Sequence, residues 1–359
     1  MGFAPGYNPA LPCFRPGSEL DRLRRNWEAY AIAQGMTPAN AALHAQSMVV
    51  NRRLADIRKT RQRLLLQTDA HVRGIDRINA AHAAGQDPSK GITGAIERRV
   101  RGDDRDLTVW STRMASIATG DNHLADFTQM YLERADLSVA DRTVFNTDVR
   151  RELLGVDTGN APARRAADSY RTFSEWRRAE LNDLGMDIHE LDTYGYSRSY
   201  ITENVAPDGD TTAFVDYLEQ LYSRPGVTAP LLDDTGAPLI AGTPEMRAVL
   251  ERIAENIRDQ DIGGSIGRTP SAMRSRHSQA RVIHILDPAE RIAFEDLFCD
   301  VDLLAMSQRT NLSTAREVSM MQMFGPNPDR GYAMQRDHAQ RLGARHLYAV
   351  DILYEQAAG

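Results

Sequence analysis

The chain of 359 residues is long enough for two domains, and its content of 42% apolar and 26% charged residues is typical of a folded protein with a sizeable core. Its net charge of −6 argues against a general binder of polyanions, and its two cysteines, Cys13 and Cys299, match no paired zinc-ligand spacing and suggest no disulfide scaffold. No window reaches the roughly 18 consecutive apolar residues of a membrane-spanning helix, and the first residues do not resemble a signal peptide, so we expect synthesis in a cytoplasm.

The composition favours helices over sheets. Only 7% of residues are aromatic, long β-branched runs are few, and Ala, Arg, Leu, Glu and Asp are abundant. We predict a mainly α fold: an elongated helical bundle with one long N-terminal helix, and a small β-hairpin or short strands in the C-terminal half. The predicted segments are an extended arm (1–17), a long-helix segment (18–90), a helical bundle (91–205) and a helical domain with short β elements (206–359).

Two capping patterns begin the helical part. "SELD" at Ser18 predicts a first helix that ends at Gly35, and "TPAN" places Thr37 at the N-cap of a second helix that runs to about residue 84. This second helix would be about 70 Å long at 1.5 Å per residue. Its apolar stripe needs a partner along its length, either another helix of this chain or a neighbouring subunit, and we expect that part of it meets a neighbouring copy or another protein. The stripe consists of Val50, Leu54, Ile57, Leu64, Val72, Ile75 and Ile78.

Shorter elements are predicted after a break at 85–94. Helices are expected over 94–101, 104–118, 121–134, 139–154 and 162–184, with caps at Asp121, Ser138 and Asn160. A structured loop should cover 187–210, followed by a helix from Asp210 to Tyr222, a small hairpin within 229–242 and a helix from Thr243 to about Gln260. The remaining predictions are a short strand over 281–286, a helix capped by Asp287, and helices over 301–324 and 329–355.

Several residues suggest chemistry without completing a known pattern. The adjacent His277 and Ser278 cannot form a triad by themselves, and His284 alternates with apolar residues as a packed histidine does. "IGGSIG" lacks the remaining residues of a phosphate-binding loop, and His189 with Glu190 lacks the second histidine of a zincin.

Carboxylates are the other candidates for chemistry. Divalent cations could bind Asp300 and Asp302, or Asp103, Asp104 and Asp106, although helix caps are the favoured role. A glycosidase or lytic transglycosylase could use Glu180, Glu190 or Glu295, and this alternative stays open. We therefore assign no catalytic, cofactor-binding or metal-ligating residue, and expect no enzyme, no cofactor and no small-molecule substrate.

A basic stretch lies in the middle of the long helix. Six basic residues stand against the single Asp56, and they wrap the side away from the apolar stripe. This pattern indicates contact with DNA or with an acidic partner, or else a solvated face. The six are Arg52, Arg53, Arg58, Lys59, Arg61 and Arg63.

The segment from about 165 to 330 resembles a module of internal virion proteins of tailed bacteriophages, also called ejection proteins. In that module a strand of the form R-H-x-x-x-R leads to an Asp at a helix start, then to "AR(D/E)" and "GPNP", and "LNDLGMDIHELDTYGY" from Leu181 to Tyr196 resembles the segment before it. The matching residues are Arg276, His277, Arg281, Ile283, Ile285, Asp287, Ala315, Arg316, Glu317, Gly325, Pro326, Asn327 and Pro328.

The resemblance implies a structural virion component that is made in the cytoplasm of the host bacterium. Such a protein is packed in the head near the portal and is delivered with the genome to help DNA cross the cell envelope. The implied partners are other copies of the chain and portal or ejection proteins, with contact to DNA, and to the envelope after ejection, left open. The chain lacks the lytic or polymerase domain of some longer relatives, so no enzymatic role carries over. The alternatives are a virion-associated peptidoglycan-cleaving enzyme and a DNA-binding head protein.

Overall fold

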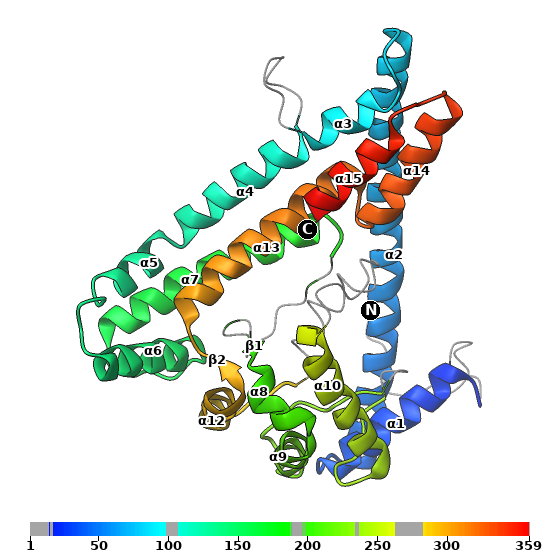
Figure 1. Cartoon of the computed structure of the whole chain (residues 1–359). Coiled ribbons are helices and arrows are strands. Elements are labelled where there is room, and N and C mark those ends of the chain that lie inside the picture. Colours follow the sequence, from blue (N-terminus) through cyan, green and yellow to red (C-terminus); the bar gives the residue numbers. More distant parts are fainter. Residues whose placement is uncertain are drawn as a thin grey trace, which may run out of the picture. The chain divides into compact units, whose positions relative to one another are not determined.

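The computed structural model describes Phe14 and residues 17–97, 107–186, 188, 196, 198–233, 237–262 and 283–358 (Figure 1). Within these residues the fold is mainly α, as predicted, with two short strands, β1 (Ser199–Tyr200) and β2 (Cys299–Asp300), that pair in one sheet. No described helix is long and apolar enough to cross a membrane. The chain divides into two compact units: unit 1 (Met1–Arg58, Tyr200–Gly264 and Arg281–Cys299) and unit 2 (Lys59–Ser199, Ser265–Ala280 and Asp300–Gly359).

Unit 1 has two apolar cores. In one, α9 buries Phe214 and Leu218 at a spacing of four residues, and they pack with Met246 and Leu250 of α10, which have the same spacing. In the other, Trp27 of α1 packs with Val49 of α2 and with Phe14, which is buried although most of the predicted arm lies outside the described residues. The helical elements of unit 1 are α1 (Glu19–Ala33), the start of α2 (Pro38–Ala83), α8 (Thr202–Val205), the 3₁₀ turn η2 (Pro207–Gly209), α9 (Thr212–Tyr222), α10 (Pro244–Ile262) and α12 (Pro288–Phe298).

Unit 2 is built around α13, which packs along α4 (Figure 1). One core joins α5, α6 and α7 through Phe127, Phe145 and Tyr170, and a second joins Ile78 of α2 with Phe324 and Tyr354. The helices of unit 2 are the rest of α2, then α3 (Lys90–Ile96), α4 (Val109–His123), α5 (Ala125–Leu132), α6 (Val139–Leu153), α7 (Ala161–Asp183), α13 (Leu303–Phe324), α14 (Pro328–Arg341) and α15 (Leu347–Ala358).

The local start signals of several helices are confirmed. Ser18, Ser138 and Asn160 each accept a hydrogen bond from the backbone N–H three residues on, as N-cap side chains do. Asp287 caps α12 and Asp302 caps α13 in the same way. Asp210 accepts from the Thr212 N–H, although the N-cap position of α9 is Thr211. The long helix is also confirmed, because α2 runs unbroken over 46 residues.

Three predicted helix boundaries are wrong. Asp121 does not start a helix, because α4 continues past it to His123 and its carboxylate accepts a hydrogen bond from Asn311 instead. The predicted break at 85–94 contains α3, which begins at Lys90 and buries Ile92 and Ile96. The predicted helix over 329–355 is two helices, because Gly343 adopts a left-handed φ of 82° and ends the first of them.

The predicted β elements are shorter than expected. In the described part of the small hairpin predicted within 229–242, Leu232 and Pro238 form an antiparallel bridge, and the Leu239 N–H donates to the Leu231 carbonyl at 2.8 Å. Of the predicted strand over 281–286, the described residues form one bridge, from Ile285 to Thr228. The loop expected over 187–210 contains β1, α8 and η2 in its described part, and Val205 of α8 is fully buried.

Candidate functional site

Several predicted candidates lie outside the described residues. They are the pair His277 and Ser278, the zincin-like His189 and Glu190, the acidic run Asp103, Asp104 and Asp106, the glycine-rich segment from residue 263 onward, and Cys13. The remaining candidates have defined surroundings.

Glu180 belongs to a polar cluster in the core of unit 2, which we call the Arg177 cluster: Ser116, Asp121, Arg177, Glu180 and Asn311. The Arg177 side chain is almost fully buried, and its Nη1 donates to Glu180 Oε2 and to Ser116 Oγ, both at 2.5 Å. Its Nη2 donates to Asn311 Oδ1, and Asn311 Nδ2 donates in turn to Asp121 Oδ1 at 2.8 Å.

The Arg177 cluster cross-links three helices. Asp121 and Ser116 come from α4, Arg177 and Glu180 from α7, and Asn311 from α13. Burial lowers the pKa of Arg177, while the charges of Glu180 and Asp121 act in the opposite direction. A buried guanidinium needs such acceptors, since an unpaired one is costly. The oxygens of Glu180 are thus engaged in holding the core together.

The other carboxylates also have structural partners. Glu295 is 1% exposed and accepts from Arg291 Nε at 2.9 Å, one turn away on α12. Asp302 accepts from the Ala305 N–H as the cap of α13. Burial raises the pKa of Asp300, but hydrogen bonds from the Asp302 N–H and from Arg309 outweigh it and hold the pKa below its usual range. The predicted role of Asp302 as a helix cap is confirmed.

Two further candidates are packed in unit 1. His284 is half-buried, and its carbonyl oxygen accepts from the Ala229 N–H at 2.9 Å. Cys299 is buried in the apolar core of the same unit. Among the described residues, no three or more His, Cys, Asp or Glu side chains are placed to hold a metal ion.

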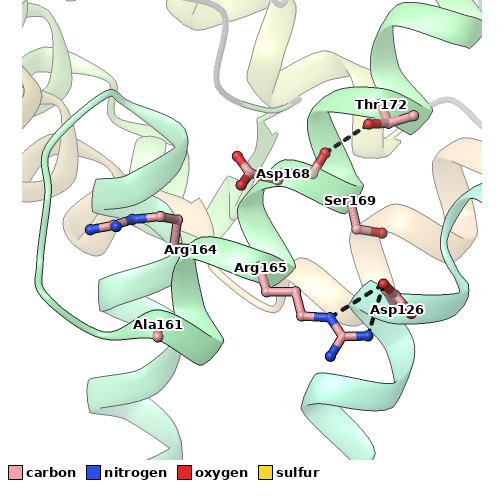
Figure 2. Close-up of a pocket in the computed structure, with 7 residues that line it drawn as sticks. All are labelled: Asp126, Ala161, Arg164, Arg165, Asp168, Ser169 and Thr172. Atoms are coloured by element: carbon pink, nitrogen blue, oxygen red, sulfur yellow. Dashed lines mark hydrogen bonds and ion pairs between the residues drawn. The ribbon is translucent and has the colours of Figure 1, made fainter.

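A hollow of about 400 Å³ lies beside the N-terminal half of α7, and Figure 2 shows the seven residues that line it. Arg165 reaches across to Asp126, with 3.1 Å between Nη2 and Oδ2, while Arg164 pairs with Asp157 outside the lining. Ser169 Oγ accepts from the Phe127 N–H and donates to the His123 carbonyl. The polar side chains that line this open hollow therefore already have partners within the protein, and we assign no ligand to it.

The "GPNP" motif forms the turn between α13 and α14. Gly325 adopts a left-handed φ of 90°, and the side chain of Asn327 caps α14 by accepting from the Arg330 N–H at 3.0 Å. Gln67 of α2 clamps this turn: its Nε2 donates to the Phe324 carbonyl at 2.7 Å and its Oε1 accepts from the Asn327 N–H at 3.0 Å. A side chain at position 331 would collide with the same Phe324 carbonyl. The motif is thus a close-packed turn between two helices.

Helix α2 has an exposed apolar face. No residue between 51 and 69 is buried, and Leu54 is 47%, Leu64 65% and Leu65 71% exposed. In the part of the chain that the structure describes, the predicted stripe is therefore mostly exposed, and of its members only Ile78 is buried. The buried side of α2 in unit 2 is instead made of small residues, Ala70 and Gly74, together with Ile78.

The basic stretch lies on the same part of α2, and its residues differ in exposure and in their contacts. Arg63 is half-buried and donates from Nε to the Gly185 carbonyl at 2.7 Å and from Nη2 to the Met186 carbonyl at 2.9 Å. Arg53, Arg58 and Arg61 are exposed. The exposed part of α2 thus presents apolar and cationic side chains together, and it is the candidate functional site of the described residues.

Sequence reasoning missed the clamp of Gln67 and the roles of Arg177 and Asn311. Nothing near these residues in the sequence marks them, because the contacts of Gln67 with Phe324 and of Arg177 with Asn311 span more than 100 residues of chain. A glycine in a helix interior was the available signal: Gly120 allows the close approach of Asn311, and Gly331 that of the Phe324 carbonyl.

Comparison of the chain with known protein families, with curated proteins and with solved structures finds no match.

Proposed function

We propose that this chain is a structural component of a bacteriophage particle, an internal protein that is packed in the head near the portal and delivered with the genome. The observation that carries the proposal is the exposed apolar face of α2, because large apolar residues repeated along an exposed helix face favour a surface that another molecule covers. A subunit of an assembly needs such a surface.

The residues that resemble the virion module support the same proposal. Ile283 and Ile285 lie in the apolar core of unit 1, and Asp287 caps α12. Ala315 is fully buried, and Gly325 belongs to the clamped turn. These roles are those of a packing module, which fits a protein that acts through its surfaces.

Mass spectrometry of purified phage particles tests the proposal. We expect the chain in intact particles and its loss from particles that have released their DNA. Absence of the chain from intact particles would refute the virion role. Equal amounts before and after release would keep the structural role and refute delivery with the genome.

The proposal that the chain is not an enzyme has its own test. Glu180 and Glu295 are engaged with Arg177 and Arg291, so we expect no muropeptide release when the protein is incubated with peptidoglycan. Release that disappears in Glu180→Gln, Glu190→Gln or Glu295→Gln would replace the proposal by a peptidoglycan-cleaving function.

A further inference from the structure

The exposed face of α2 has the spacing of a helix-pairing seam. Leu54, Ile57, Arg61 and Leu64 follow one another at intervals of three, four and three residues, and Leu65 lies next to Leu64. At 1.5 Å per residue, the seam from Leu54 to Leu65 is about 17 Å long. All of these residues lie on one unbroken helix, so their spacing follows from helix geometry alone.

Arginines flank the apolar part of the seam. If Leu54 and Ile57 occupy the a and d positions of a heptad, then Arg53 is at g and Arg58 at e, the two positions that contact the flanks of a paired helix. Arg61 occupies the next a position. The face is thus complementary to a helix with apolar residues at its centre and negative charges at its edges.

We propose that this face of α2 docks an acidic amphipathic helix of another protein. The inference deepens the proposed function, on which it rests for the expectation of a partner. Leucine or isoleucine of the partner would cover Leu54, Ile57 and Leu64, and its Glu or Asp side chains would pair with Arg53 and Arg58.

A second copy of the chain fits this face less well. In a parallel pair in register, Arg53 of one copy would lie against Arg58 of the other. Like charges opposite one another in a helix pair disfavour the pairing, so charge complementarity selects a different, acidic chain.

Membranes and DNA are also less suited to the face. An interfacial membrane helix needs a broad apolar face, with Trp, Phe or Leu side chains, whereas this seam is one or two residues wide, contains no aromatic residue and is interrupted by Arg61. DNA would satisfy the arginines through its phosphates but would leave Leu54, Leu64 and Leu65 in contact with charged backbone.

The experiment measures binding of a fluorescently labelled peptide of about four heptads, with Ile at a, Leu at d and Glu at e and g, to the full chain by fluorescence anisotropy. The matched peptide carries Lys at e and g. We expect the acidic peptide to bind at least about tenfold more tightly than the basic one, with the difference shrinking as salt is raised. Equal binding of both peptides, or no binding of the acidic one at low salt, would overturn the proposal.

Variants of the chain sharpen the test. The double variant Arg58→Glu with Arg61→Glu should lower the affinity for the acidic peptide at least about tenfold and raise the affinity for the basic one. Leu65→Asp should lower the affinity for the acidic peptide by a similar factor. Arg22→Glu on α1 and Leu312→Asp on α13, both exposed, are the matched controls and should leave binding unchanged. Loss of binding in the controls as well would overturn the assignment to α2. Thermal melts followed by circular dichroism confirm that each variant is folded.

Three other outcomes would replace the acidic helix by a different occupant. Binding to anionic lipid vesicles, or to duplex DNA, that the α2 variants abolish while the acidic peptide does not bind would assign the face to a membrane or to DNA. Light scattering that shows an oligomer dissociated by Leu65→Asp would assign it to a second copy. Because the presence of the chain in phage particles is measured separately, failure of the docking proposal leaves the proposed function standing.

Discussion

Helix α13 is buried over most of its length, whereas α2 leaves one face exposed between residues 51 and 69. In α13 even small polar residues are buried, and Ser307, Thr314 and Ser319 donate to carbonyls of their own helix. In the unit 2 part of α2, the packed side consists of Ala70, Gly74 and Ile78, and the larger apolar residues face outward.

The comparison shows that apolar periodicity predicts a helix but not what covers it. The stripe of large residues on α2 suggested the packed side, but the small residues opposite let neighbouring backbones approach more closely. A residue at 74 larger than glycine would collide with Gln335 of α14, and one at 91 would collide with the backbone of Ile78. In this helix, small size rather than hydrophobicity marks the intramolecular contact.

The largest expected effect is in α13. Asn311→Leu removes one acceptor of Arg177 and the donor to Asp121, while Glu180 and Ser116 still bind the guanidinium. Because two hydrogen bonds to charged groups are lost, we expect urea unfolding to show a loss of about 3 to 5 kcal/mol. The neighbouring Leu312, 54% exposed, is the control, and Leu312→Ala should cost less than about 0.5 kcal/mol. Similar losses for both would contradict the structural role of the Arg177 cluster.

The two sides of α2 can be compared directly. Ile78→Ala should destabilise the chain by about 2 to 5 kcal/mol, because Ile78 is fully buried. Leu65→Ala should change its stability by less than about 0.5 kcal/mol in the absence of a partner. A large loss for Leu65→Ala in urea unfolding would mean that the chain itself covers this face.

A substitution in α4 should have an intermediate effect on the free energy of unfolding. A Cβ at position 120 would collide with the side chain of Asn311, so Gly120→Ala should cost about 1 to 3 kcal/mol through overpacking despite the better helix propensity of alanine. Thr119→Ala, at the neighbouring exposed position, should be close to neutral. Stabilisation by Gly120→Ala in a thermal melt would show that α4 and α13 can move apart without cost.

The smallest expected change in stability depends on pH. Burial raises the pKa of Asp87, but hydrogen bonds from Ser89, the Arg345 N–H and His346 outweigh it and hold the pKa well below its usual range. Because the folded pKa is depressed, this stabilisation is complete above the unfolded pKa of about 3.9 and is lost as pH falls towards the folded value. Asp87→Asn should therefore cost about 1 to 2 kcal/mol at pH 7, and the difference from the unchanged chain should narrow below about pH 4.

Urea unfolding at several pH values checks this prediction. Asp87→Asn is best compared with His346→Ala, because the latter removes one donor to Asp87 but leaves the backbone donors of Ser89 and Arg345 in place. A difference between Asp87→Asn and the unchanged chain that stays constant from pH 7 to about pH 3 would contradict it.

The sequence predicted those features that depend on residues three or four positions apart. Ser18, Ser138, Asn160 and Asp287 were found as caps because a cap and its N–H donor lie within one turn. Asp121 failed as a cap because its partner, Asn311, lies 190 residues away.

The same limit applies to the candidate site. The apolar stripe and the basic residues of α2 could be read from their spacing, but their exposure could not, since the pattern does not show which side Ala70 and Gly74 would pack. Arg63 illustrates this limit, because it belongs to the basic stretch in sequence but donates to the Gly185 and Met186 carbonyls.

The contact between Gln67 and the "GPNP" turn can form only late in the synthesis of the chain. Gln67 leaves the ribosome 257 residues before Phe324, which at about 5 to 20 residues per second is a delay of roughly 13 to 50 s. Throughout that delay Ile78 has no Phe324 to pack against, and α2 is present in the nascent chain with apolar residues exposed on both of its sides. We therefore expect the core of unit 2 that joins Ile78 to Phe324 to form late, and chains truncated before residue 325 to aggregate or to be held by chaperones.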